Sequence, residues 1–200
     1  MREDVARWNW KYRALTLEKE PDATLMSVRC KLRAEGLAID VACGGGANTH
    51  FISNCGYEVI GLDCSFEALR KAKLLASYRL VSFVVADVDD FVWPTSVFTL
   101  VNVVKFLNRR LFKSLAESVK PGGQLFYKTF NARHLIKNPR FSPDYVLRLG
   151  ELVDWLYDWD IQETNDLPDN IESFSYILAK KPENYEKAAI PVCERPRISA

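Results

Sequence analysis

The chain has 200 residues, 48% of them hydrophobic and 26% charged, which is typical of a single globular domain with a sizeable core. Its net charge of +1 argues against a nucleic-acid or anionic-membrane partner, and no apolar run approaches the roughly 20 residues that a membrane span needs. Five cysteines without C-x-x-C spacing, two histidines and an N-terminus without a secretory signal favour a cytoplasmic location and disfavour disulfides and a metal site.

The N-terminal part is predicted to form two helices. Apolar residues, among them Trp8 and Tyr12, recur at helical spacing over residues 4–18 and predict an amphipathic helix. Asp22 is a suitable N-cap for a second helix, which should end by Gly36.

A strand and a glycine-rich turn follow. Residues 37–41 (LAIDV) are apolar apart from Asp40, as in a strand buried on both faces of a parallel sheet. The three glycines at 44–46 permit a sharp turn and a close approach of backbone to a ligand, because glycine has no Cβ. A helical pattern begins at Ala47 and ends at Gly56, so its free N–H groups should point back over the strand end. The segment predicts a binding site for an adenosine cofactor.

Three classes of cofactor site use this arrangement. A phosphate-binding P-loop ends in Gly-Lys-Ser/Thr, and this turn has no lysine. The dinucleotide pattern G-x-G-x-x-G matches at Gly44 and Gly46, but Thr49 stands at its third glycine. Asp40 would face the pyrophosphate of a dinucleotide unfavourably, whereas it suits the ammonium group of a methionine moiety. Asp63 comes 19 residues after Gly44 at the end of an apolar run and can accept both ribose hydroxyls.

Strands alternate with helices as far as residue 130, which predicts a doubly wound, mostly parallel sheet with helices on both faces. Ligands of such sheets bind beyond the carboxyl ends of the strands, where Asp63 and Asp87 should lie. Two further strands should add to the sheet in antiparallel fashion. The strands are expected over 57–62, 81–86, 97–104, 124–130, 158–164 and 173–179, and helices over 65–77, 111–119 and parts of 143–157.

Several segments together resemble the class I S-adenosylmethionine-dependent methyltransferases, and within them the small tellurite-resistance-type branch. Residues 40–46 (DVACGGG) and 61–65 (GLDCS) are similar to the first two motifs of that family, and 86–87 and 119–130 to later ones. The resemblance implies a Rossmann-like seven-stranded sheet whose last strand is antiparallel. It also implies one methyltransferase domain over residues 1–182, with helices of 1–36 capping the cofactor and a tail at 183–200.

The resemblance implies S-adenosylmethionine as cofactor, S-adenosylhomocysteine as product and no metal. It places an adenine contact at Asp87 and at the backbone of Val88, although an acid after a strand can also simply cap the next turn. Cys43 and Cys64 are expected to be small apolar fillers beside the cofactor rather than reactive thiols. The resemblance indicates no catalytic residue. The cofactor-binding residues expected on this basis are Tyr12, Asp40, Ala42, Cys43, Gly44, Gly46, Asp63, Cys64, Asp87, Val88 and Val104.

The acceptor is expected to be a small molecule with a soft or anionic nucleophile. Residues 102–106 (NVVKF) lack the Asn/Asp-Pro-Pro-Tyr motif of enzymes that methylate amides or exocyclic amines. The connection after residue 130 carries Arg133, His134 and Arg140, and is either a solvated loop or a lid that attracts an anion. Phe106 and Tyr127 would form the apolar wall of such a pocket.

Other interpretations remain open from the sequence. A nicotinamide-dependent oxidoreductase shares the fold, and a non-catalytic S-adenosylmethionine-binding regulator would share the site. No nucleic-acid or membrane partner is expected, and the protein should be a monomer or a homodimer. The chain departs from the family at Thr99 and Lys128, where acids are usual, and its acidic 166–172 segment replaces the basic residues of the tellurite-type proteins.

Overall fold

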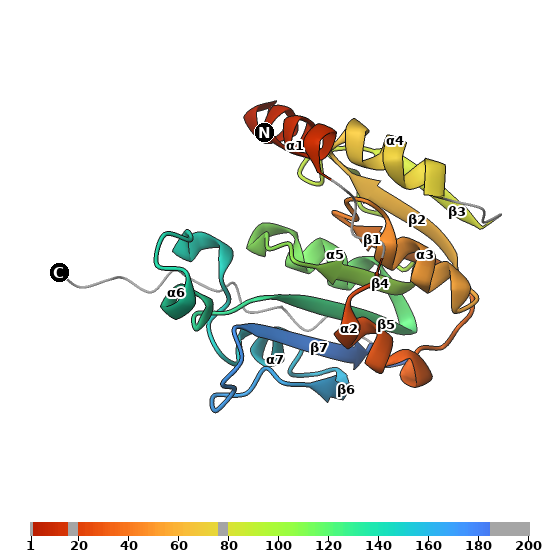
Figure 1. The fold of residues 1–200 in the computed structure, drawn as a ribbon. Helices are drawn as coiled ribbons and strands as arrows, with labels where there is room; N and C mark the ends of the chain where they lie inside the picture. Colours follow the sequence, from red (N-terminus) through yellow and green to blue (C-terminus); the bar gives the residue numbers. More distant parts are fainter. Residues whose placement is uncertain (1, 16–19, 76–79, 185–200) are drawn as a thin grey trace.

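A seven-stranded sheet forms the centre of the computed structural model, which describes residues 2–15, 20–75 and 80–184. Its strands are β1 (Leu37–Val41), β2 (Glu58–Asp63), β3 (Val81–Val85), β4 (Phe98–Val104), β5 (Val119–Phe130), β6 (Asp160–Thr164) and β7 (Phe174–Lys180). Their order is β3-β2-β1-β4-β5-β7-β6 (Figure 1). Strands β1 to β5 pair in parallel, and β7 is antiparallel to both β5 and β6. The predicted fold class is therefore confirmed.

Helices cover both faces of the sheet (Figure 1). Leu25 and Val28 of the N-terminal segment and Ile52 pack on one face, around Phe126. Leu115 and Leu152 belong to the core on the opposite face. The helices are α1 (Arg2–Ala14), α2 (Ala23–Ser27), α3 (Ala47–Asn54), α4 (Phe66–Leu75), α5 (Phe112–Ser118), α6 (His134–Lys137) and α7 (Glu151–Trp155).

The second predicted helix is shorter than expected. Asp22 caps α2 as predicted, because its side chain accepts from the N–H groups of Thr24 and Leu25. After α2 a single 3₁₀ turn covers Arg29–Lys31, and Leu32 after it is extended. The cause is a tertiary contact: the buried Gln124 amide on β5 accepts from the Arg33 N–H and donates to the Lys31 carbonyl. These bonds replace those that a continued helix would make.

Strand β5 also begins earlier than predicted, at Val119 rather than at residue 124. Phe98 pairs with Val119 and Leu100 pairs with Gln124, so residues 120–123 bulge between the two pairs. Gly122 has φ of +71° within this bulge, a conformation that favours glycine. The predicted ends of the first and fourth helices, at 16–18 and 76–77, and residues 185–200 of the predicted tail lie outside the described ranges.

Candidate functional site

The turn after β1 has the backbone geometry that its glycines predict. Ala42, Gly44 and Gly46 have φ of +53°, +54° and +79°, and the Gly46 N–H donates to the Cys43 carbonyl at 3.0 Å. The left-handed conformation is unfavourable for Ala42, and such strain concentrates at functional sites. A Cβ on Gly44 would meet the Tyr12 hydroxyl, so a side chain here would be strained at φ +54° and would also have to displace the end of Tyr12.

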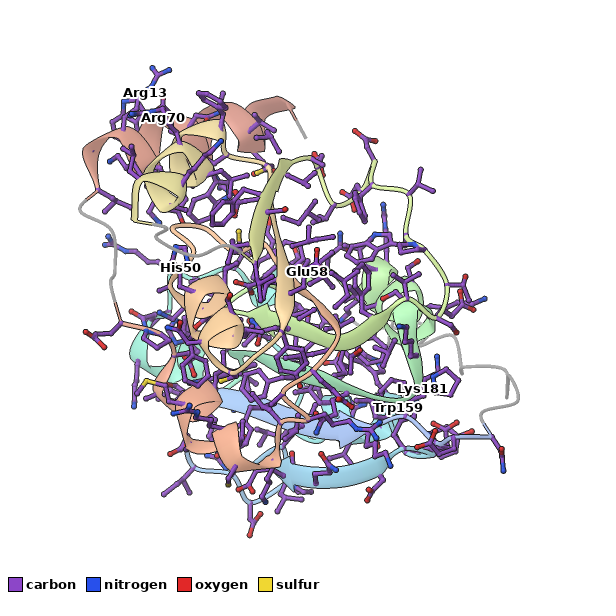
Figure 2. The ribbon with its side chains drawn as sticks, turned by 90° about the vertical axis from the view of Figure 1, so that its right-hand side faces the viewer. Arg13, His50, Glu58, Arg70, Trp159 and Lys181 are labelled. Atoms are coloured by element: carbon purple, nitrogen blue, oxygen red, sulfur yellow. The ribbon has the colours of Figure 1, made fainter. Side chains whose placement is uncertain are left out.

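Helix α1 brings Tyr12 over this turn by docking on α4 (Figure 1). The Asn9 side chain accepts from the Ser65 hydroxyl at 3.1 Å and from the Glu67 N–H at 3.0 Å. Arg13 donates to Glu67 at 3.1 Å, and Figure 2 shows Arg13 beside Arg70, which pairs with the same carboxylate. The N-terminal helix is therefore tied to the beginning of α4 by polar contacts, beside the turn that it covers.

Asp63 joins the end of β2 to the glycine turn. Its carboxylate accepts from the Gly44 N–H and from the Ser65 N–H, each at 2.8 Å, and the residue is 7% exposed. Burial raises the pKa of this carboxyl group, and the two N–H donors oppose the rise. Each oxygen keeps a further lone pair, so the carboxylate can hold the turn and also accept from a ligand hydroxyl.

Asp40 lies beneath the turn with two neutral partners. The Thr49 hydroxyl and the Asn102 amide each donate to its carboxylate at 2.6 Å, and Asp40 is 1% exposed. Burial raises its pKa from 3.8 to about 6, although both hydrogen bonds oppose the shift. The predicted contact with a ligand ammonium stays a prediction. What the structure adds is a carboxylate that is already oriented by two side chains.

Sequence reasoning missed Asn102 and missed the role of Thr49, which drew notice only as an absent glycine. Asn102 is fully buried on β4 directly opposite Asp40 in the strand register. Its Oδ1 atom is buried without a hydrogen-bond partner among the described residues. The available signal was a single amide in the otherwise apolar run 100–104 (LVNVV).

The cysteines at the site are suited to packing rather than to nucleophilic chemistry. Burial raises the pKa of the Cys43 thiol well above its usual range, and it raises that of Cys64 to about 11. Nearby Asp63 adds to both shifts. Both thiols are therefore protonated at neutral pH, in keeping with their predicted place as small fillers.

The segment after β3 begins beside Asp63, whose carbonyl accepts from the Ala86 N–H at 3.0 Å. Asp87 is half-buried and its carboxylate accepts from the Asp89 N–H at 3.1 Å, which closes a local turn. The Val88 carbonyl accepts from the Trp93 indole at 3.2 Å. The structure thus brings Asp87 and Val88 to the edge that holds Asp63, and their adenine contacts stay a prediction.

The predicted acceptor residues are not gathered in one place. Tyr127 is 1% exposed and packs on Phe112 and Trp155 within the core, so its predicted place in a pocket wall is wrong. Strand alternation directs it to the face that α5 and α7 cover. The Tyr127 hydroxyl donates to the carbonyl of Phe106, which is half-buried beside the same core. Val104, a predicted cofactor contact, is half-buried on the opposite face of the sheet, beside the core that contains Phe126.

The basic connection after β5 is partly built into the fold. The His134 ring lies 4.0 Å from the Phe130 ring and 4.8 Å from the Phe141 ring, between centroids. Arg133 is half-buried, whereas Arg140 is exposed. His134 therefore packs in an aromatic cluster, and its predicted place in a lid stays a prediction together with those of the two arginines.

Lys128 has a structural explanation that the sequence did not supply. It is 8% exposed, and its ammonium donates to both carboxylate oxygens of Asp22 at 2.9 Å and to the Thr24 hydroxyl at 2.8 Å. Asp22 in turn donates its backbone N–H to the side chain of Asn48, the second residue of α3. This buried ion pair therefore links β5 to α2 and to the helix that begins at the glycine turn.

These contacts fit an adenosine cofactor with an amino-acid tail. A carboxylate, a close-packed glycine backbone and an aromatic cap meet at the carboxyl ends of β1 and β2, where ligands of doubly wound sheets bind. The buried amide oxygen of Asn102 supplies a further acceptor. In the described part of the chain, no group of three or more metal-ligating side chains is found, and no helix is long and apolar enough to cross a membrane.

Comparison with known proteins agrees with this geometry. A family described as "Methyltransferase domain" matches residues 38–123. The ubiquinone biosynthesis O-methyltransferase of Pectobacterium atrosepticum is 30% identical, and the match covers 66% of this chain and 66% of that relative. An S-adenosylmethionine-dependent methyltransferase from Mesorhizobium loti matches 80% of this chain and 98% of its own with a TM-score of 0.65 at 17% identity. The match with TehB from Haemophilus influenzae covers 88% of this chain and 66% of that protein, with a TM-score of 0.64 at 17% identity.

The structural likenesses establish the shared fold, and the profile match covers the segment from β1 to the β5 bulge that contains the glycine turn and Asp63. The chain spans 66% of the length of the Pectobacterium relative. The sequence motifs, the sheet order, the sequence matches and the structural matches all indicate the same family. The chain belongs to the class I S-adenosylmethionine-dependent methyltransferase family.

Proposed function

We propose that the protein is an enzyme that transfers a methyl group from S-adenosylmethionine to a small-molecule acceptor, leaving S-adenosylhomocysteine. The observation that carries the proposal is the contact between Asp63 and the Gly44 N–H beneath the Tyr12 cap. It is supported by the family to which the chain belongs. Residues 1–182 would form the catalytic unit, with the helices of residues 1–36 as its cap.

Each residue of the site has a binding or orienting task in this proposal. When bound, the cofactor supplies a methyl group on a sulfonium centre. Asp63 would accept from the ribose hydroxyls, and its bonds to Gly44 and Ser65 fix the orientation of its carboxylate. Asp87 and the Val88 backbone would contact the adenine. Because a well-oriented acceptor about 3 Å away needs little further assistance, the rate would come largely from positioning.

The acceptor is proposed to present a soft or anionic nucleophile. The curated relative is named for O-methylation, and a phenolic oxygen that ionises would meet this description. Arg133 and Arg140 lie on the connection that leaves the end of β5. A positive field from these side chains would favour the ionised acceptor and would attract it to the sheet edge.

Calorimetry tests the cofactor first. The purified chain should bind S-adenosylmethionine and S-adenosylhomocysteine, and it should not bind NAD or NADPH. The Asp63→Ala variant should lose affinity, whereas Asp160→Ala, which changes an exposed acid on β6, should not. A screen of small acceptors for S-adenosylhomocysteine release would then identify the substrate. Binding of a nicotinamide cofactor in place of S-adenosylmethionine would overturn the proposal.

A further inference from the structure

Helix α1 is held on the rest of the protein by polar contacts rather than by a buried face. Among its described side chains, those of residues 4–14, none is buried, and Trp10 is 73% exposed. A helix of 13 residues is only marginally stable by itself, so its position depends on what it contacts. These contacts lie on α4, which runs beside α1 (Figures 1 and 2). They also decide where Tyr12 lies, because Tyr12 is on α1 and its hydroxyl fills the space next to Gly44.

The contact with the most hydrogen bonds is made by the ammonium group of Lys71, in the middle of α4. It donates to the carbonyl oxygens of Tyr12, Arg13 and Leu15 at 2.5, 3.2 and 2.9 Å. The three bonds use all the donors of an ammonium group, and they fall on carbonyls that the end of a helix leaves without helical partners. The positive charge also lies at the negative end of the α1 dipole. Lys71 therefore holds the end of α1 that carries Tyr12.

The other contacts of α1 with α4 are weaker or lie farther from that end. The ion pair with Glu67 involves an Arg13 side chain that is 68% exposed, and exposed pairs of this kind contribute little. The Asn9 side chain accepts from the Ser65 hydroxyl and from the Glu67 N–H, about one helical turn before Tyr12. Loss of the Lys71 contact would thus release the last turn of α1, while Asn9 would still hold the middle of the helix.

We propose that Lys71 is a positioning residue that sets how fast the cofactor enters and leaves. The Gly44 backbone is where the ligand is expected to approach closely, and the end of Tyr12 lies against it. Cofactor exchange then requires the last turn of α1 to lift from the glycine turn, and this movement breaks the Lys71 bonds. The same bonds form again on closure and keep Tyr12 over the bound ligand. This inference rests on the proposed function and adds to it a residue that acts through α1.

The test measures cofactor release from Lys71→Met, which keeps a long side chain and removes the charge. S-adenosylhomocysteine should leave this variant about tenfold faster than the parent in stopped-flow dilution of the complex, as expected for lost bonds of a charged donor. Lys71→Arg should restore most of the parent rate, because a guanidinium group also donates to carbonyl oxygens. Lys73→Met is the matched control: it makes the same change at an exposed residue of α4 and should leave the release rate unchanged.

Hydrogen exchange separates this role from a general loss of stability. In Lys71→Met the amides of α1 should exchange faster, while those of β1 and β2 keep the parent rate. Asn9→Ala removes the contact at the middle of α1, should speed both release and exchange, and carries the test if Lys71→Met does not fold. Release at the parent rate from folded Lys71→Met, or from Asn9→Ala in its place, would overturn the inference, and so would equal acceleration in Lys73→Met. A parent protein that binds no S-adenosylhomocysteine would instead overturn the proposed function.

Discussion

Replacing Asp40 by Asn should stabilise the ligand-free protein near neutral pH, although it removes a residue of the proposed site. Burial raises the pKa of Asp40 from 3.8 to about 6. The difference corresponds to about 3 kcal/mol at about 1.4 kcal/mol per pH unit. Because the unfolded chain holds an ordinary carboxyl group, the stability that neutral Asp40 contributes is fully present below about pH 4 and is lost as the pH rises through about 6.

The substitution keeps the local hydrogen bonds while it removes the charge. The Asn102 amide can donate to the new carbonyl oxygen, and the Thr49 hydroxyl can accept from the new amide. The variant should therefore unfold at higher urea concentration than the parent at about pH 8, by about 2–3 kcal/mol in the free energy of unfolding. The advantage should shrink steadily as the pH is lowered towards 4.

Asp22→Asn is the matched control, because it makes the same chemical change at another buried acid. Asp22 is paired with Lys128, so its loss leaves a buried ammonium without a counter-charge and should destabilise by about 3 kcal/mol or more. The two variants should thus differ in sign at about pH 8. A destabilised Asp40→Asn variant at that pH, or an advantage that does not change with pH, would refute the reasoning.

Three further outcomes are expected. Gly44→Val should abolish S-adenosylhomocysteine binding in calorimetry, because the new side chain meets Tyr12 and φ is +54°; unchanged affinity in a folded variant would contradict the placement of the turn. Asp63→Ala should weaken the same ligand by about 2–4 kcal/mol, through lost ribose bonds and a loosened Gly44 N–H, and equal binding would remove Asp63 from the ribose. Lys128→Met combined with Asp22→Leu should restore most of the stability that Asp22→Asn removes, as measured by thermal unfolding; no recovery would show that the pair acts through more than its charges.

The sequence predicted those parts of the site whose signals are local. The turn at 44–46 and the acid that ends β2 each follow directly from an apolar run, and parallel strands bring their carboxyl ends to one edge. The Asp63 carboxylate reaches the Gly44 N–H because β1 and β2 pair in parallel and end side by side. The sheet order and the antiparallel β7 agreed with the family resemblance, which extended over most of the chain.

What the sequence could not predict are pairings between distant residues. Asn102 and Asp40 are 62 positions apart, and Lys128 and Asp22 are 106 apart, so no local pattern relates either pair. Tyr127 was misplaced for a related reason. Residues 124–129 of β5 are all buried, so the sequence does not show which of them face α5 and α7. Tyr127 lies on that side, where it packs against Trp155. Each of these outcomes depends on tertiary contacts that override local preference.

Asp22 and Asp40 are two acids with buried side chains that differ in their partners: Asp22 is paired with a cation, whereas Asp40 is not. Asn48 and Thr49 are consecutive residues of α3, and the first receives the Asp22 N–H while the second donates to Asp40. Asp22 has its cation within the chain, in Lys128, and its charge is therefore satisfied in the ligand-free protein. The side-chain partners of Asp40 are neutral, so burial of its charged form is unfavourable in the ligand-free protein. A fold that needed Asp40 only for packing would gain stability from a neutral residue there. A positively charged group of a bound ligand would offset this cost, as the predicted contact between Asp40 and the ligand ammonium requires.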